Sequence, residues 1–131
     1  MAYSLALGFV FVLVMRFVLK TGPVGQERVL AALCGYLLLG HLFGALHLLV
    51  AGAQDGAYSI GVVDLHDARV DFVYYSFVTL TTLGYGDILP LTDAARSLSI
   101  VEAALGVMYL GVLVARLIGL GRNPPETSAP P

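Results

Sequence analysis

The fold is decided by one stretch of the sequence, Thr79-Leu80-Thr81-Thr82-Leu83-Gly84-Tyr85-Gly86-Asp87. It ends a short apolar and aromatic run, residues 72–83, which is too short to cross a bilayer and lies between two longer apolar segments. Irregular backbone at membrane depth persists only where it lines water or is buried in protein. We therefore predict a re-entrant segment, a short helix whose first turn Asp71 caps and which leads into a loop that turns back.

The loop has the residues that an ion filter made of backbone carbonyls requires. An ion gives up its water shell only where closely spaced oxygens replace it, and successive inward-pointing carbonyls supply them. That arrangement needs left-handed or otherwise unusual dihedral angles at alternate residues, which glycine adopts at almost no steric cost. Gly84 and Gly86 meet this need, and Thr82 adds a hydroxyl oxygen at the inner end.

The surroundings of the loop also suit a filter. Tyr85 is expected to point outward and to brace the loop against aromatic side chains of the short helix, such as Tyr74 and Tyr75. The short helix directs its partially negative C-terminal end at the cavity below the loop, which favours a cation there.

In these residues the sequence resembles the potassium channel family, whose filter pattern T-x-G-Y-G-D is matched by Thr82, Leu83, Gly84, Tyr85, Gly86 and Asp87. The resemblance covers roughly residues 29–120, and it is greatest to small bacterial channels of the two-helix pore type. It implies potassium bound along residues 82–85, with Gly86 completing the filter and no other cofactor. Because one chain has one filter loop, the resemblance also implies a homotetramer.

Two positions depart from the family pattern. Leu83 stands where valine is usual, so the packing behind the filter is expected to differ while its carbonyl stays the same in kind. Val78 stands where some bacterial members have a glutamate that bonds the aspartate after the filter. From the family's arrangement, Tyr74 is the expected partner of Asp87 instead.

The composition agrees with a bilayer environment. Of 131 residues, 58% are hydrophobic and 12% charged, whereas soluble domains have about a quarter charged residues. A net charge of −2, without a cluster of basic residues, gives no reason to expect nucleic acid as a partner. Cys34 is the only cysteine, so an intrachain disulfide is excluded.

We predict an all-α membrane protein with an N-terminal hydrophobic helix at residues 1–21 and a pore domain at residues 22–120. Within the pore domain we expect an outer helix at 28–53, an extracellular loop at 54–70, a pore helix at 71–82, the filter at 82–87 and an inner helix at 94–120. Residues 121–131, which contain four prolines, are expected to be a disordered tail.

Basic residues predict the orientation in the plasma membrane. They cluster on one side of the apolar segments (Arg16, Lys20, Arg28, Arg116, Arg122) and are fewer on the other (Arg69, Arg96). The first group is expected to be cytoplasmic, with the C-terminus, and the filter extracellular. A signal peptide is disfavoured because the basic residues follow the apolar core of the first segment. An extracellular start at Met1 is unusual, and a shortened version of a longer protein is one explanation.

The inner helix has one stripe that is expected to face the pore cavity, formed by Ala103, Val107, Leu110 and Val114. This stripe is apolar, so it also suits a gate that closes by dewetting. Gly106 lies where many family members have a hinge glycine. Gating by bending at Gly106 and close helix packing at Gly106 are two open interpretations.

Glu102 is the acidic residue within a spanning segment, and it is turned by about 100° from Ala103. We expect it to face the re-entrant helix, with its Thr and Tyr hydroxyls, and to brace it rather than to place a charge in the cavity. His41 and His47 are expected to be packed or interfacial, because no cysteine or carboxylate joins them at metal-ligand spacing. Arg16 and Lys20 alone do not form a voltage sensor.

The sequence gives reasons against three rival functions. A weakly selective cation channel would have a substitution at Tyr85 or Gly86, and a non-conducting regulatory or assembly subunit would have a broken filter string; the sequence has neither. An enzyme is not expected, because no nucleophile, base and oxyanion donors assemble from these residues.

Overall fold

The computed structural model describes residues 2–18, 26–60 and 68–120, and the expected tail at residues 121–131 lies outside them. In the described part, four helices and two short strands follow one another: α1 (Ala2–Val18), α2 (Gln26–Ala53), β1 (Tyr58–Ile60), α3 (Ala68–Leu80), β2 (Ile88–Pro90) and α4 (Asp93–Leu120). Segments Val29–Ala53 and Asp93–Ala115 are long and apolar enough to cross a membrane. The predicted outer and inner helices correspond to α2 and α4.

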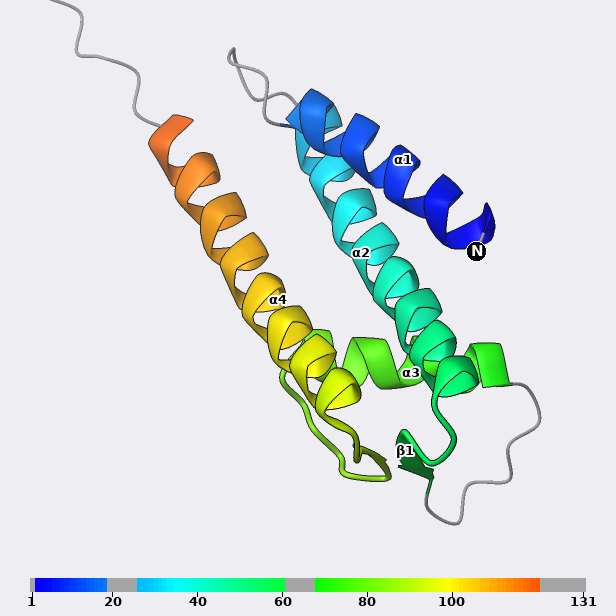
Figure 1. Ribbon diagram of the computed structural model, residues 1–131. Coiled ribbons are helices and arrows are strands. Elements are labelled where there is room, and N and C mark those ends of the chain that lie inside the picture. The colour runs from blue at the N-terminus through cyan, green and yellow to red at the C-terminus, as the bar shows by residue number, and fades with distance from the viewer. Residues whose placement is uncertain (1, 19–25, 61–67, 121–131) are drawn as a thin grey trace, which may run out of the picture.

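The two long helices run side by side in opposite directions, and α3 lies across the end where α2 stops and α4 begins (Figure 1). α1 lies beside the first half of α2, where Val14 and Met15 approach Gly35. At its start, α4 is capped by Thr92, whose Oγ1 accepts a hydrogen bond from the backbone N–H of Ala95 at 3.4 Å. This cap places the start of α4 directly after the filter loop.

Glycines on both long helices make room for α3. A Cβ atom added at Gly40 would lie 2.6 Å from Cζ of Phe77, and one at Gly44 would lie 2.9 Å from Cα of Val73. On α4, a Cβ at Gly106 would lie 2.2 Å from the backbone oxygen of Leu80. All three separations are shorter than van der Waals contact. At Gly44 and Gly106 the nearest atoms are backbone, which cannot turn away, so glycine is needed there for α2 and α4 to approach α3 this closely; at Gly40 they belong to the ring of Phe77.

A short strand pair fixes the outer end of the fold. β1 and β2 pair antiparallel, with Tyr58 opposite Pro90 and Ile60 opposite Ile88. The N–H of Leu91 also donates to the carbonyl of Ala57 at 2.8 Å. The pairing joins the segment before α3 to the segment after the filter loop, and three residues per strand are too few to give a recognisable sequence pattern.

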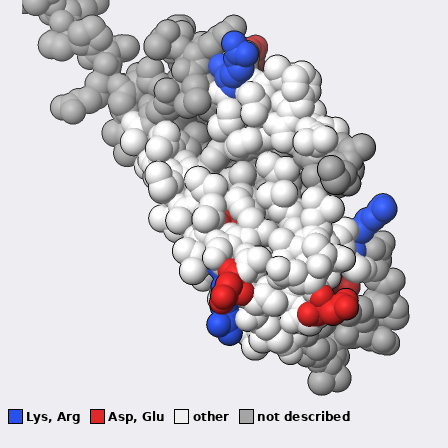
Figure 2. All heavy atoms as spheres, in the orientation of Figure 1, with Lys and Arg blue, Asp and Glu red and all other residues white. Residues whose placement is uncertain are grey.

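Two apolar clusters form the core. The first comprises Leu39, Phe43 and Leu80, with Phe11 and Tyr109 among the residues that pack against it. The second comprises Phe72, Tyr75 and Ile88 under the strand pair. Outside these clusters many large apolar side chains are exposed, and on the face drawn in Figure 2 most charged residues lie near the two ends. A broad uncharged surface between charged ends suits a bilayer.

The helix bounds differ from the predicted ones mainly at α3. The helix begins at Ala68 and ends at Leu80, whereas residues 71–82 were predicted. Asp71 therefore lies inside the first turn and does not cap it. The predicted start was wrong because Ala68 to Val70 follow a polar stretch of sequence without a break in composition. The predicted end was wrong because Thr82 leaves the helical region of backbone space, with φ of 59°.

Candidate functional site

The backbone of the filter loop alternates in conformation. Positive φ angles occur at Thr82 (59°), Gly84 (59°) and Gly86 (82°), and these are every second residue of the loop. The alternation is the one predicted for a path lined by consecutive carbonyls. Thr82 was predicted to be a filter residue, but only Gly84 and Gly86 were assigned unusual dihedral angles, and a residue with a Cβ costs about 1–2 kcal/mol in the left-handed region. The surrounding structure must therefore hold Thr82 in place.

Backbone N–H groups tie the loop to the end of α3. The N–H of Thr82 donates to the carbonyl of Thr79 at 2.9 Å, and the N–H groups of Leu83 and Gly84 donate to the carbonyl of Val78 at 2.9 and 3.2 Å. In the described part of the chain, the carbonyl oxygens of residues 82–86 accept no hydrogen bond. Because residues 82–86 are exposed within a single chain, these oxygens are available to a ligand outside this chain's own hydrogen bonds.

The loop faces away from the rest of its own chain. Residues 81–86 are exposed, with Leu83 at 55% and Tyr85 at 67%. The expected bracing of Tyr85 by Tyr75 is wrong for this chain, because Tyr75 is buried and points its hydroxyl at Ser99, 2.7 Å away. The ring of Tyr75 instead packs toward α4 and the strand pair.

Asp87 has the partner that the family arrangement implied. The hydroxyl of Tyr74 donates to Oδ2 of Asp87 at 2.6 Å, and the N–H of Ile88 donates to Oδ1 at 3.1 Å. The hydrogen bond from Tyr74 is the main cause that lowers the pKa of Asp87 below its ordinary value. Val78, where a glutamate occurs in some relatives of the family, is buried and apolar. The bond from Tyr74 holds the carboxylate at the end of the loop.

Tyr74→Phe is expected to lower the melting temperature of the protein near neutral pH more than in acid. An acid with a lowered pKa stabilises the fold fully above its ordinary pKa and loses this contribution as the pH falls through the lowered value. Without the hydroxyl, the pKa of Asp87 returns toward its ordinary value, so the variant lacks this contribution and has none to lose in acid. Melting temperature against pH measures the difference between the two proteins. Tyr109→Phe, which removes a hydroxyl bonded to the carbonyl of Ala32, should lower stability by the same amount at both pH values; a constant difference between wild type and Tyr74→Phe would contradict the expectation.

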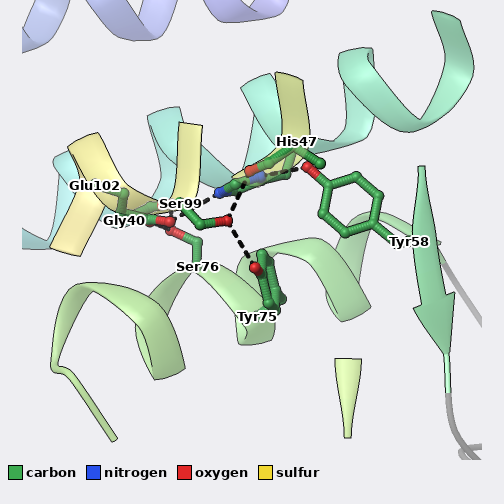
Figure 3. A network of polar contacts seen from close by, with 8 residues as sticks. Gly40, His47, Tyr58, Tyr75, Ser76, Ser99 and Glu102 are labelled. Carbon is green, nitrogen blue, oxygen red and sulfur yellow. Dashed lines mark hydrogen bonds and ion pairs between the residues drawn. The ribbon is translucent and has the colours of Figure 1, made fainter. Parts of the chain in front are cut away.

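Behind the loop, a polar network joins α2, α3, α4 and β1 (Figure 3). Nε2 of His47 lies 2.8 Å from Oε2 of Glu102, and both side chains are fully buried. Ser76 on α3 bonds the other carboxyl oxygen of Glu102 and also the carbonyl of Gly40 at 2.7 Å. Tyr58 on β1 bonds Nδ1 of His47 at 2.6 Å. The network therefore links the strand pair to the middle of all three pore-domain helices.

A second polar chain lies beside the first. Tyr75 bonds Ser99 Oγ, which donates to the carbonyl of Ala95 at 2.9 Å. The ring of Tyr75 also stands edge-on to that of His47, with centroids 4.9 Å apart and an interplanar angle of 80°. Burial is the main cause that raises the pKa of Tyr58, so its hydroxyl keeps its proton.

The prediction for Glu102 was right in direction and wrong in partners. It faces α3, but it bonds Ser76 and His47 rather than the Thr and Tyr hydroxyls of that helix. Sequence reasoning missed His47 because the two residues are 55 positions apart. The available signal was that both are ionisable residues within spanning segments, where such groups usually have partners. His41 is exposed and bonds the carbonyl of Leu37, and the described residues contain no cluster of potential metal ligands.

On α4, the predicted cavity stripe is open to its surroundings. Val107, Leu110 and Val114 are exposed, and Ala103 is half-buried. Gly106 is buried beside this stripe, against the backbone of Leu80, so its contacts favour the packing interpretation over the hinge. A Cβ at Gly111 would meet nothing within 4 Å.

Two spanning helices, a short helix across one end and a loop with alternating left-handed residues together define the pore domain of a membrane channel. A profile of the ion channel family matches residues 31–122, and the chain belongs to this family.

Several curated proteins are similar in sequence. A voltage-gated potassium channel from Aeropyrum pernix is 31% identical over 101 residues, which cover 70% of this chain and 33% of that protein. Two-pore potassium channel 1 of Arabidopsis thaliana is 35% identical over 90 residues, which cover 69% of this chain and 22% of that one. Two-pore potassium channel 4 of the same plant is 45% identical over 49 residues, which cover 37% and 17%. The chain thus matches a third or less of each of these relatives.

Proposed function

We propose that this chain is the pore-forming subunit of a potassium-selective channel that conducts K⁺ passively through a filter of backbone carbonyls. The observation that carries the proposal is the alternation of positive φ angles at Thr82, Gly84 and Gly86, combined with carbonyls at 82–86 that accept no hydrogen bond from the described residues. Oxygens of Thr82, Leu83, Gly84 and Tyr85 replace the water shell of K⁺, and Gly86 closes the outer end. Similarity to proteins named potassium channels supports the choice of ion.

The remaining site residues act as supports and as the path below the filter. Tyr74 and Asp87 hold the outer end of the loop, Val78 anchors it through two backbone bonds, and Tyr75 and Glu102 hold α3 against α4. The stripe of Ala103, Val107, Leu110 and Val114 lines the cavity under the filter. Because the stripe is apolar, the cavity conducts when wide and dewets when narrow.

The functional unit is a homotetramer in the plasma membrane. One loop supplies a quarter of a closed ring of carbonyls, and α4 offers apolar side chains outside the cavity stripe to neighbouring copies, among them Ile100 and Met108. Arg28 lies near the start of α2 and Arg116 near the end of α4, and both of these ends are the ones away from the filter. Basic residues favour the cytoplasmic side, so the filter lies at the extracellular side. The C-terminus is then cytoplasmic.

The tetramer is tested by mass measurement of the purified protein in lipid nanodiscs, together with ion flux in liposomes. We expect a mass of four chains and uptake of potassium that exceeds uptake of sodium by at least about tenfold. Only monomers or dimers would contradict the assembly. A tetramer without flux would favour a regulatory or assembly subunit, and equal uptake of both ions would favour a weakly selective cation channel.

A further inference from the structure

The pair of His47 and Glu102 places two ionisable groups face to face between the spanning helices α2 and α4. Among the described residues, Glu102 is bonded by His47 and by Ser76 from α3 and lies within electrostatic range of Tyr36 from α2. The titratable groups that face His47 are Glu102, Tyr58 from β1 and Tyr75 from α3. A carboxylate that is isolated from water is costly unless a cation or several donors compensate it. The position of each hydrogen in this network therefore decides its charge.

The two hydrogen bonds of Ser76 indicate where the hydrogen between Ser76 and Glu102 lies. Its Oγ lies 2.7 Å from the carbonyl oxygen of Gly40 and also within bonding distance of Oε1 of Glu102. A hydroxyl has one hydrogen, and a carbonyl can only accept. If Ser76 donates to Gly40, the bond between Ser76 and Glu102 needs a hydrogen on Glu102.

The hydrogen bonds of His47 are compatible with the same donor-to-acceptor direction. Tyr58 donates its hydrogen to Nδ1 of His47, which leaves Nε2–H to donate to Oε2 of Glu102. The hydrogens then run one way, from Tyr58 to His47, to Glu102, to Ser76 and to the carbonyl of Gly40. Each bond has one donor and one acceptor, and every side chain is uncharged.

We propose that Glu102 is a protonated, uncharged carboxylic acid that completes this chain of hydrogen bonds, and that loss of its proton at alkaline pH loosens α3 and lowers conduction through the filter. The conduction part rests on the proposed function. When the proton leaves, Ser76 turns its hydrogen to the carboxylate and releases Gly40, so the bond between α2 and α3 is lost and a charge stays buried. Glu102 is thus a positioning residue, since it acts on the filter through α3.

The protonation state is tested by infrared spectroscopy on the purified protein in lipid at neutral pH, without any ion flux. Subtracting the spectrum of Glu102→Gln from that of wild type should leave the carbonyl stretch of a protonated carboxyl group, shifted by deuterium exchange. Glu27→Gln serves as the control, because Glu27 is exposed at the start of α2 and should instead remove a carboxylate band. A carboxylate band for Glu102 would overturn the proposal, because it would mean an ion pair with a protonated His47.

The switch is tested by potassium flux in liposomes against pH. Glutamine reproduces the protonated acid, because its NH₂ donates to Ser76 and its carbonyl accepts from His47, but it has no proton to lose. Wild-type flux should fall about tenfold between neutral and alkaline pH, as expected when one buried bond is broken, while Glu102→Gln flux stays within about twofold. Glu102→Ala should be impaired at every pH.

Equal pH profiles of wild type and Glu102→Gln would overturn the switch. A protonated band in a protein that conducts no potassium would leave the hydrogen-bond chain standing and refute the channel function. A carboxylate band in a potassium-selective channel would refute the hydrogen-bond chain and leave the channel function standing.

Discussion

Gly106→Ala is expected to destabilise the folded protein strongly, whereas Gly111→Ala is expected to leave it as stable or more stable. The added Cβ at Gly106 would lie 2.2 Å from the backbone oxygen of Leu80 and 3.0 Å from its carbonyl carbon. Backbone atoms cannot rotate away, so α4 must move off the end of α3. Overpacking of this kind costs about 1–3 kcal/mol.

Gly111 is the matched control on the same helix. A Cβ there meets nothing within 4 Å among the described residues of its own chain, and alanine in a helix interior is favoured over glycine by about 0.5–1 kcal/mol. Thermal melting of both variants in lipid measures the difference. Melting of Gly106→Ala at the wild-type temperature, with loss of channel opening alone, would contradict the packing role and restore the hinge interpretation.

The second large effect is expected at the filter, where Gly86→Ala and Tyr85→Ala should reduce selectivity before they reduce folding. Gly86 has φ of 82°, and a side chain costs about 1–2 kcal/mol at such angles. A Cβ at Gly86 meets nothing within 4 Å in its own chain, so the cost is backbone strain in the outer filter. Tyr85 is 67% exposed, so its ring is available to a neighbouring subunit, and its removal frees the loop.

Leu83→Val is the matched control within the loop. It restores the residue that is usual in the potassium channel pattern and retains the backbone carbonyl. Residue 83 does not have a positive φ angle, so valine causes no backbone strain there. We expect it to keep wild-type selectivity. The ratio of potassium to sodium permeability, measured in bilayers alongside melting of the protein, separates the outcomes. Selective currents from Tyr85→Ala and Gly86→Ala would show that the outer filter does not depend on these residues.

Local chemistry made much of this site predictable. The positive φ angles of Gly84 and Gly86 were predictable, because glycine is the residue that adopts positive φ without cost. Helical spacing also predicted that Glu102 faces α3. Thr82 gave no such signal, since threonine is disfavoured in the conformation that it adopts. Its geometry follows from the bonds that tie the loop to α3, which exist only in the folded chain.

Contacts between distant segments were the part that the sequence did not reveal. His47 meets Glu102 because Gly40 and Gly106 let α2 and α4 close on α3, and no periodicity within one helix encodes that meeting. Tyr58 reaches His47 because a strand pair folds it back, and that pair is too short to be recognised. Intramembrane ionisable residues are the general clue to such partners.

Potassium selectivity is tested most directly by the reversal potential of the wild-type channel. A carbonyl filter compensates potassium for its lost water better than sodium, which holds its water more tightly. In a bilayer with potassium on one side and sodium on the other, we expect the current to reverse near the potassium equilibrium potential. A reversal near zero, with sodium carrying comparable current, would contradict the account and identify a non-selective cation pore.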